Sequence, residues 1–383
     1  MDLKRVLRYC QAEQADMLAL LERAVKIESP THSKSDVDRM AEFFVQRFRK
    51  EKGSVRLLKH STAGSAVLAE FWGGKRTGAP PEKPILILGH TDTVWDIGTL
   101  ERMPFRVSGG RAFGPGIYDM KSGIVCGVWA IRALRRLGIV PRGPVRFFLN
   151  PDEETSSIAF RKELMAEAGK ARAVLVLEPA AAGGALKTSR KGVGEFRVTV
   201  HGRSAHAGIN PSAGVNAISE LARQIQRIEK FAQPRRGLTL TVGMIEGGTR
   251  PNVVPETASA RIDVRIPRLK DRGPIEAKVR ALKAVHPEAR IEIKGGINRP
   301  PMERAMAKDL FHVARHLGCQ LGLDLKEAST GGGSDGNFTA ALGIPTLDGL
   351  GGVGDGAHAR HEHIIIRELP RRAALLAALI AHI

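Results

Sequence analysis

The sequence predicts a two-domain α/β protein, in which a small α+β domain is inserted into a larger domain built on a mixed sheet. The chain has 383 residues, more than one ordinary domain holds. Short apolar runs alternate with segments of helical period, a pattern typical of a sheet covered by helices. From about residue 193 the predicted order becomes β-α-β-β-α-β, as in a ferredoxin-like domain. We therefore assign residues 193–301 to the inserted domain and residues 1–192 and 302–383 to the larger, discontinuous one.

In the larger domain, helices are expected where apolar side chains recur every three or four residues. Strands are expected where a short apolar run stops at turn residues. The predicted helices cover residues 13–28, a segment from about Ser35, residues 120–137, residues 303–317 and a last segment from about Glu368. The predicted strands cover residues 55–58, 66–71, 85–88, 145–149 and 173–177.

The inserted domain is expected to contain half-exposed strands, because its apolar residues tend to occupy every second position. Strands are predicted at residues 195–201, 238–245, 258–266 and 289–294, and helices at residues 213–230 and 274–285. After the chain returns to the larger domain, a glycine-rich loop is expected at residues 330–336.

His90 and Asp92 directly follow the predicted strand 85–88. Residues two apart on an extended chain point the same way, so the carboxylate can lie behind the imidazole. A histidine that binds a metal usually has such a partner on its second nitrogen. A purely structural His–Asp pair would have the same sequence, so the motif needs support from elsewhere in the chain.

Further carboxylates occur at the ends of predicted elements. Glu153 and Glu154 follow the next predicted buried strand, and Glu178 follows the one after it. Asp119 is predicted at the N-cap of the helix that begins at Met120. A solvated acidic loop or a simple cap explains each of them singly. In open α/β sheets, however, ligands gather at the carboxyl ends of the strands, and several carboxylates there predict a bound cation.

Cysteine usage and apolar runs narrow the class of protein. Cys10, Cys126 and Cys319 form no C-x-x-C pair, which excludes a cysteine-rich zinc site and provides no disulfide framework. A reducing, cytoplasmic location is the simple interpretation. The first residues lack a signal-peptide pattern, and apolar runs such as 373–381 are too short to span a bilayer, so no membrane partner is expected.

The formal net charge of +19 raises the question of an anionic partner. The basic residues are dispersed along the chain, and no nucleic-acid-binding motif accompanies them. We therefore expect a solvated basic surface and no specific nucleic-acid partner. Such a surface would still attract anionic substrates.

Six motifs occur in order along the chain: Gly89–Val94, Gly116–Gly123, Asp152–Glu154, Leu177–Pro179, Gly202–Gly208 and Gly356–His358. Taken in this order, they resemble the motifs of the M20 metallopeptidase family. That family includes glutamate carboxypeptidases, aminoacylases, and acetylornithine and succinyl-diaminopimelate deacylases. The resemblance covers nearly the whole chain and implies a zinc-peptidase catalytic domain with an inserted lid or dimerisation domain.

The resemblance implies two zinc ions per subunit, with Co²⁺ or Mn²⁺ as substitutes. The implied metal ligands are His90, Asp119, Glu154, Glu178 and His358. Asp119 would bridge the two ions, and a cis peptide bond would follow it. Asp92 would support His90 from behind. Imidazole and carboxylate ligands suit zinc on chemical grounds as well.

The resemblance also assigns two catalytic roles. Glu153 would be the general base, which takes a proton from the attacking water and passes it to the leaving nitrogen. His206 would project from the lid domain of a partner subunit in a homodimer and stabilise the oxyanion. The alternative for His206 is a turn residue between a strand and a helix.

Residues that match substrate-binding positions of the family lie in the second half of the chain. Asn252 and Arg265 would hold a free carboxylate, for which a guanidinium is suited because it pairs bidentately. Gly332 and Gly333 would add backbone donors. Arg265 could instead be one more surface arginine. Pro115 stands where many members carry Arg, which should alter the loop before the bridging aspartate.

The predicted function is hydrolysis of the amide bond to an amino acid with a free α-carboxylate, as in a glutamate carboxypeptidase. An N-acyl-amino-acid deacylase of the acetylornithine or succinyl-diaminopimelate type is the alternative, because the two activities share their metal ligands. Glu178, where some members carry Asp, favours both over an aminopeptidase. The third hypothesis, a non-catalytic binding protein, predicts a missing ligand or base, and none is missing. Small molecules or short peptides with a free carboxylate are the expected partners.

Overall fold

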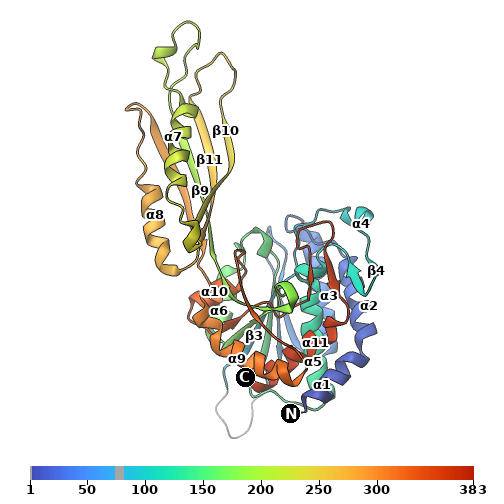
Figure 1. The fold of residues 1–383 in the computed structure, drawn as a ribbon. Coiled ribbons are helices and arrows are strands. Elements are labelled where there is room, and N and C mark those ends of the chain that lie inside the picture. Colours follow the sequence, from blue (N-terminus) through green and yellow to red (C-terminus); the bar gives the residue numbers. More distant parts are fainter. Residues whose placement is uncertain (1, 74–81) are drawn as a thin grey trace. The chain divides into compact units, whose positions relative to one another are not determined.

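A computed structural model describes residues 2–73 and 82–383 of the chain and divides it into two compact units. The larger unit comprises Met1–Ser189, Arg304–Ser329 and Ser334–Ile383, and the smaller unit comprises Arg190–Glu303 and Thr330–Gly333. Figure 1 shows the ribbon of both. Among the described helices, none is long and apolar enough to cross a membrane.

The larger unit is built on a six-stranded mixed sheet of order β1-β2-β6-β3-β7-β14. β3, β6, β7 and β14 run parallel, while β1 and β2 are antiparallel to their neighbours. The strands are β1 Ser54–Leu58, β2 Ala66–Phe71, β3 Ile85–His90, β6 Val145–Asn150, β7 Ala173–Val176 and β14 Thr346–Leu347. Every residue of β3 is buried, because helices cover both faces of the sheet, and this explains its unbroken apolar run.

Helices cover the two faces of this sheet in separate groups (Figure 1). On one face, Phe48 of α3 packs against Phe71 and Phe147, with ring centroids 5.8 and 4.8 Å apart. On the other, side chains of α6 and α10 pack against alternate residues of β2, β3, β6 and β7. The helices are α1 Leu3–Ala12, α2 Gln14–Val25, α3 Lys34–Lys50, α4 Thr99–Arg102, α5 Ser122–Arg136, α6 Arg161–Lys170, α9 Arg304–Gln320, α10 Gly336–Ala341 and α11 Glu368–His382.

Short strands complete the larger unit. A four-stranded antiparallel sheet has the order β15-β16-β5-β4, and β13 pairs with β8 in a two-stranded ribbon. β15 and β16 form a hairpin, and β16 pairs with β5 shortly before the segment that carries Asp119. The bounds are β4 Arg106–Ser108, β5 Arg111–Phe113, β8 Leu186–Arg190, β13 Glu327–Thr330, β15 Gly354–Asp355 and β16 His363–Ile365.

The smaller unit has its own hydrophobic core beneath a four-stranded antiparallel sheet of order β10-β11-β9-β12. Alternate residues of β9, such as Phe196 and Val198, are fully buried, and α7 and α8 pack on that face. The elements are β9 Gly192–His201, α7 Ala217–Glu229, β10 Thr239–Gly247, β11 Thr257–Ile266, α8 Arg272–Arg280 and β12 Arg290–Arg299. Their order is the predicted β-α-β-β-α-β, so the α/β fold class with an α+β insertion is confirmed.

The prediction that Asp119 caps a helix is wrong. The helix α5 begins at Ser122, and Asp119 and Met120 have non-helical backbone angles (φ −112°, ψ 96° and φ −133°, ψ 35°) around a cis peptide bond. The side chain of Asp119 contacts His90 and is therefore not turned toward the helix N-terminus. The implied cis peptide bond after Asp119 is present.

Other differences concern helices. The prediction lacked α1, although Leu3, Val6 and Cys10 are buried at the spacing of one helical face. It also lacked α4, α6 and α10. α8 ends at Arg280, five residues before the predicted end, and residues 281–289 lead from it to β12.

A close approach of α5 to the end of β7 generates a testable prediction. A Cβ added at Gly123 would lie 2.1 Å from the carbonyl oxygen of Leu177, so the backbone would have to move. We expect Gly123→Ala to lower the free energy of unfolding by about 1–3 kcal/mol in urea titrations. Gly169→Ala is the control, because nothing lies within 4 Å of its Cβ. It should stabilise α6 by about 0.5–1 kcal/mol. Equal stability of the two variants would contradict the close packing.

Candidate metal centre

The parallel strands bring the polar residues of the sequence motifs to one edge of the central sheet. His90 is the last residue of β3 and lies opposite Asn150, the last residue of β6. Glu153 and Glu154 follow Asn150 in a short 3₁₀ turn, and Glu178 lies two residues beyond β7. This is the carboxyl edge at which open α/β sheets bind ligands.

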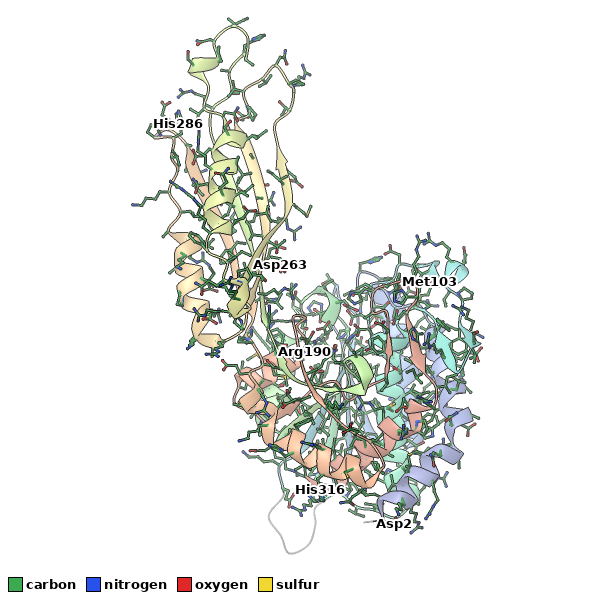
Figure 2. All side chains as sticks on the ribbon, in the orientation of Figure 1. Asp2, Met103, Arg190, Asp263, His286 and His316 are labelled. Atoms are coloured by element: carbon green, nitrogen blue, oxygen red, sulfur yellow. The ribbon has the colours of Figure 1, made fainter. Side chains whose placement is uncertain are left out.

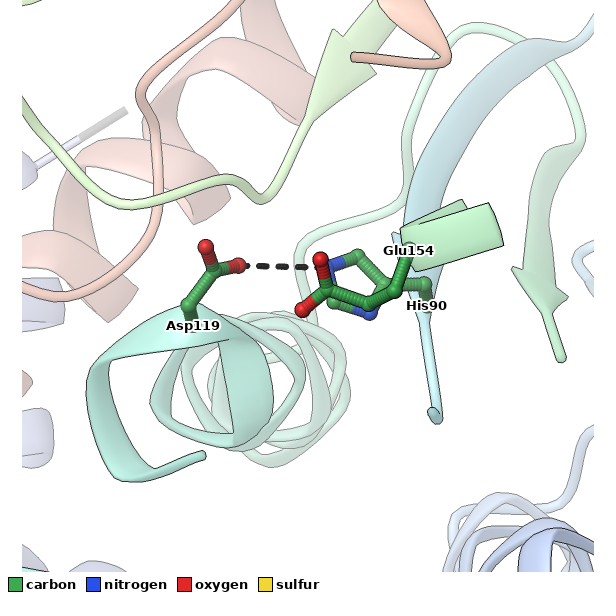
Figure 3. Close-up of side chains that lie close together, drawn as sticks. All are labelled: His90, Asp119 and Glu154. Atoms are coloured by element: carbon green, nitrogen blue, oxygen red, sulfur yellow. Dashed lines mark hydrogen bonds and ion pairs between the residues drawn. The ribbon is translucent and has the colours of Figure 1, made fainter. Parts of the chain in front are cut away.

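Asp119 lies between two histidines, and each of its oxygens faces a different one. Oδ1 is 3.1 Å from Nε2 of His90, and Oδ2 is 3.6 Å from Nε2 of His358. Figure 3 shows Asp119 with His90 and Glu154 around the same point. The carboxylate therefore directs one oxygen toward each of the two histidines.

Acidic residues accompany both histidines. Oε1 of Glu178 lies 3.6 Å from Nε2 of His90, and Oε2 of Glu154 lies 3.3 Å from Nε2 of His358. Donor atoms of His90, Asp119 and Glu154 lie within 4.8 Å of one another, and so do those of His90, Glu153 and Glu178. The structure thus brings together all five predicted metal ligands and the predicted base.

Asp92 contacts both His90 and the turn that carries Glu153 and Glu154. Its side chain is fully buried, and its Oδ1 lies 3.3 Å from Nδ1 of His90. The same carboxylate accepts the backbone N–H groups of Glu153 at 3.2 Å and Glu154 at 3.1 Å, and the hydroxyl of Thr31 at 2.7 Å. One side chain therefore orients the imidazole of His90 and the turn that carries both glutamates.

The site contains more carboxylates than imidazoles, and this shifts the pKa values of its residues. Hydrogen bonds with Asp119 and Glu154 raise the pKa of His358 to about 10. Burial opposes protonation of His90, yet hydrogen bonds with Asp119 and Asp92 keep its pKa well above the usual value. Burial works against ionisation of Asp119 too, but the two histidines hold its pKa below the usual value. Burial raises the pKa of Glu154.

Divalent cations fit these residues by donor type and by charge. Two imidazoles and several carboxylates within a few ångströms are the donors that zinc prefers. Oε1 of Glu154 is buried and has no hydrogen-bond partner among the described residues. A cation would satisfy that oxygen and balance the negative charge of the carboxylates.

Glu362 is a residue of this region that the sequence motifs did not indicate. Its carboxylate is fully buried and accepts the backbone N–H groups of Gly116, Tyr118 and Asp119 and the indole N–H of Trp95. Burial raises its pKa to about 7, against the effect of those hydrogen bonds. In the sequence, the one feature that could have indicated Glu362 is its position four residues after His358.

The predicted substrate-binding residues and His206 belong to the smaller unit. His206 and Asn252 lie on adjacent loops, since the N–H of Ala207 donates to the carbonyl of Asn252 at 3.0 Å. His206 is exposed, and its Nδ1 accepts the N–H groups of Gly208 and Ile209 at 3.1 and 3.2 Å. Because Nδ1 accepts these two hydrogen bonds, the proton of the neutral imidazole is on Nε2, the other ring nitrogen.

Arg265 is engaged within its own strand. It forms a bidentate pair with Asp263, at 2.8 and 2.9 Å, and donates to the carbonyl of Gly331 at 3.3 Å. Figure 2 labels Asp263 on the smaller unit. In the glycine-rich loop, the N–H of Gly332 donates to Oγ1 of Thr330, and Arg190 donates to the carbonyls of Gly332 and Gly333.

The chain belongs to the peptidase family M20/M25/M40, whose pattern matches residues 86–382. Carboxypeptidase G2 of a Pseudomonas species is 30% identical over 377 residues, which cover 96% of this chain and 89% of that protein. Succinyl-diaminopimelate desuccinylase of Dechloromonas aromatica is 27% identical over 331 residues, covering 80% and 85% of the two chains. The protein is thus an enzyme of the metal-dependent peptidase and amidohydrolase kind.

Solved structures agree on the fold. Aminopeptidase PepT of Bacillus cereus aligns with a TM-score of 0.78 at 21% identity, over 96% of this chain and 98% of that one. An M20 family metallo-carboxypeptidase of Sulfolobus solfataricus aligns with a TM-score of 0.72 at 16% identity, over 95% and 98%. At these identities the likeness concerns the fold alone.

The role of Asp92 predicts a stability change. Asp92→Asn keeps the shape but leaves one acceptor oxygen in place of two, so a buried N–H of Glu153 or Glu154 loses its acceptor. We expect a loss of about 1–3 kcal/mol in urea unfolding. Asp96→Asn is the control, because the side chain of Asp96 is 79% exposed, and it should change stability by less than about 0.5 kcal/mol. Similar stabilities of the two variants would contradict the anchoring role.

Proposed function

We propose that the protein is a two-zinc hydrolase that releases an amino acid with a free α-carboxylate from an amide, as a glutamate carboxypeptidase does. The observation that carries the proposal is the placement of Asp119, whose oxygens face His90 at 3.1 Å and His358 at 3.6 Å. The identity to a carboxypeptidase over 96% of the chain supports the same activity.

In this proposal Asp119 would help to hold both cations. His90 and Glu178 would hold one of them, and Glu154 and His358 would hold the other. Co²⁺ and Mn²⁺ suit the same donors as zinc. When bound, the two ions would polarise the amide carbonyl and acidify a water molecule.

Glu153 is proposed to move the proton. A carboxylate oxygen of Glu153, a ring nitrogen of His90 and a carboxylate oxygen of Glu178 lie within 4.8 Å of one another. Because Asp92 holds the backbone of both glutamates, the side chains of Glu153 and Glu154 leave the turn from fixed points. Glu153 would accept a proton from the attacking water and deliver it to the leaving nitrogen, while Glu154 serves the metal.

Arg265 is proposed to bind the free carboxylate of the substrate with the N–H groups of Gly332 and Gly333, which follow the Gly331 carbonyl that Arg265 already contacts. Asn252, the other residue predicted for this carboxylate, lies in the loop before β11, whereas Arg265 lies near the end of that strand, so within one chain the two stand at opposite ends of β11. The guanidinium of Arg265 already pairs bidentately with the carboxylate of Asp263. A substrate carboxylate is the same chemical group, so it would share or replace that partner. Asp263 is partly exposed, which keeps the cost of such an exchange low.

An N-acyl-amino-acid deacylase is the second candidate, and the identity of 27% to a succinyl-diaminopimelate desuccinylase favours it. The two activities release an amino acid through the same bond cleavage and differ in the acyl side of the substrate. A non-catalytic binding protein is the third candidate, which the presence of the base Glu153 disfavours.

The first prediction concerns Glu153 and the substrate. The zinc-loaded protein should release one class of amino acid from a panel of dipeptides, acyl-glutamates, acyl-ornithines and succinyl-amino acids, followed by mass spectrometry. Glu153→Ala should bind as much zinc as the parent but lose activity about 10²–10⁴-fold. The exposed Glu163→Ala in α6 is the matched control and should keep full activity.

The panel separates the candidates by its outcomes. The accepted acyl groups distinguish a carboxypeptidase from a deacylase, and substrates with an amidated carboxylate should be poor if that group is recognised. Near-full activity of Glu153→Ala would overturn the base assignment. Failure to turn over any member, with zinc bound, would favour the binding protein.

A homodimer with an intersubunit role for His206 is proposed from the smaller unit. β10 lies at an edge of its sheet, and Met244 and Ile245 on it are 49% and 57% exposed. An edge strand with exposed apolar residues can pair with a second copy. Nε2 of the exposed His206 would then donate to the oxyanion of the partner's substrate.

The dimer predicts a linked loss of assembly and activity. The parent should be a dimer by light scattering, and replacing both Met244 and Ile245 by lysine should give a monomer with little activity. His206→Ala should remain a dimer and lose activity about 10²–10³-fold, as for other oxyanion donors. A fully active monomer would contradict the intersubunit role.

A further inference from the structure

The hairpin β15–β16 carries two residues that meet Asp119 from different directions. Its loop, residues 356–362, contains His358, whose Nε2 lies 3.6 Å from Oδ2 of Asp119. The last residue of the same loop is Glu362, and its side chain accepts the backbone N–H of Asp119 at 3.1 Å. The hairpin thus contacts both the carboxylate and the main chain of this one residue.

Both oxygens of Glu362 are saturated with donors. Oε1 accepts the N–H groups of Tyr118 at 2.9 Å and Asp119 at 3.1 Å. Oε2 accepts the N–H of Gly116 at 2.9 Å and Nε1–H of Trp95 at 2.8 Å. The residue is fully buried, so water does not compete for these bonds.

The segment before α5 requires an acceptor of this kind. At Asp119 and Met120 the backbone is neither helical nor part of a strand, so the N–H groups here lack the partners of a regular element. A buried carboxylate that accepts the N–H groups of Gly116, Tyr118 and Asp119 defines the orientation of the peptide planes from Gly116 to Asp119. The direction of the Asp119 side chain follows from those planes.

Glu362 also connects the segments that carry the predicted ligands. Trp95 lies on the stretch that leaves β3 after His90 and Asp92, and Glu362 itself lies four residues after His358. One buried carboxylate therefore joins the His90 segment, the Asp119 segment and the His358 segment, which are distant in the sequence.

We propose that Glu362 is a positioning residue that sets the orientation of the Asp119 carboxylate between His90 and His358, and so controls metal affinity. The effect on the metal rests on the proposed two-zinc function. The positioning of the backbone does not, because it follows from hydrogen bonds of the protein alone.

The test uses the full-length protein with Glu362→Gln. Glutamine has the same size but presents one acceptor oxygen, and its NH₂ group would face N–H donors. We expect zinc affinity, measured by competition with a fluorescent chelator, to fall about 10–100-fold, as for other residues that support metal ligands. Amide hydrogen exchange in peptides that span residues 114–121 should become faster, because their N–H groups lose an acceptor.

Glu220→Gln is the matched control. Glu220 is a fully buried carboxylate of the smaller unit, and it accepts the N–H groups of Val285 and His286 at 2.8 and 3.1 Å. Its loss should lower the unfolding temperature without changing zinc affinity or exchange in residues 114–121. The comparison separates positioning from a general loss of stability.

Glu362→Asp is the second variant and serves if the glutamine variant does not fold. It keeps the charge and both oxygens on a side chain one methylene shorter, so zinc affinity should fall less than in Glu362→Gln and exchange should still rise. Unchanged exchange in residues 114–121 in a folded variant would overturn the positioning role. Unchanged zinc affinity with faster exchange would overturn the control of the metal. A parent protein that binds no zinc would overturn the proposed function and leave the exchange result to decide the positioning role.

Discussion

The burial of several carboxylates side by side is the constraint on which the rest of this structure depends. Like charges a few ångströms apart in a buried site repel strongly, and removal from water adds to the cost. At the edge of the central sheet, Asp119, Glu154 and Glu178 lie around two histidines with Asp92 and Glu153 close behind. The neighbouring carboxylates raise the pKa of His90 and His358, and divalent cations would offset the negative charge with the metal bound.

The acids of the larger unit divide by what they bind. Asp92, Glu28 and Glu362 are acceptors for backbone N–H groups, and each therefore shapes a loop. Glu28, for example, accepts the N–H groups of Gly98 and Leu100 at 2.9 and 2.8 Å. Asp119, Glu154 and Glu178 instead direct oxygens toward the histidines. The acids that accept N–H groups fix loops that lack regular hydrogen bonding. The acids that face the histidines can therefore keep their geometry.

The smaller unit carries its predicted functional residues outside its hydrophobic core. Its antiparallel sheet and two helices enclose a core of their own, and its predicted functional residues lie on loops and on one strand. Arg265 is paired with Asp263, an arrangement that orients the guanidinium and leaves it partly solvated. A carboxylate ligand would therefore meet a binding group whose present partner has the same chemistry as the ligand.

Much of the organisation was determined by the sequence itself. Periodicity located the central strands and the β-α-β-β-α-β insertion, because burial on one face or on both leaves a direct pattern in the side chains. The ordered motifs indicated the family and the residues His90, Asp119, Glu154, Glu178 and His358, since ligand chemistry restricts residue type. At Asp119 the family motifs implied a cis peptide bond whereas the local pattern indicated a helix cap, and the tertiary structure decided between the two. Tertiary structure alone decided which N–H groups Asp92 and Glu362 accept, because a carboxylate that collects N–H groups from distant segments has no signature in its own neighbourhood.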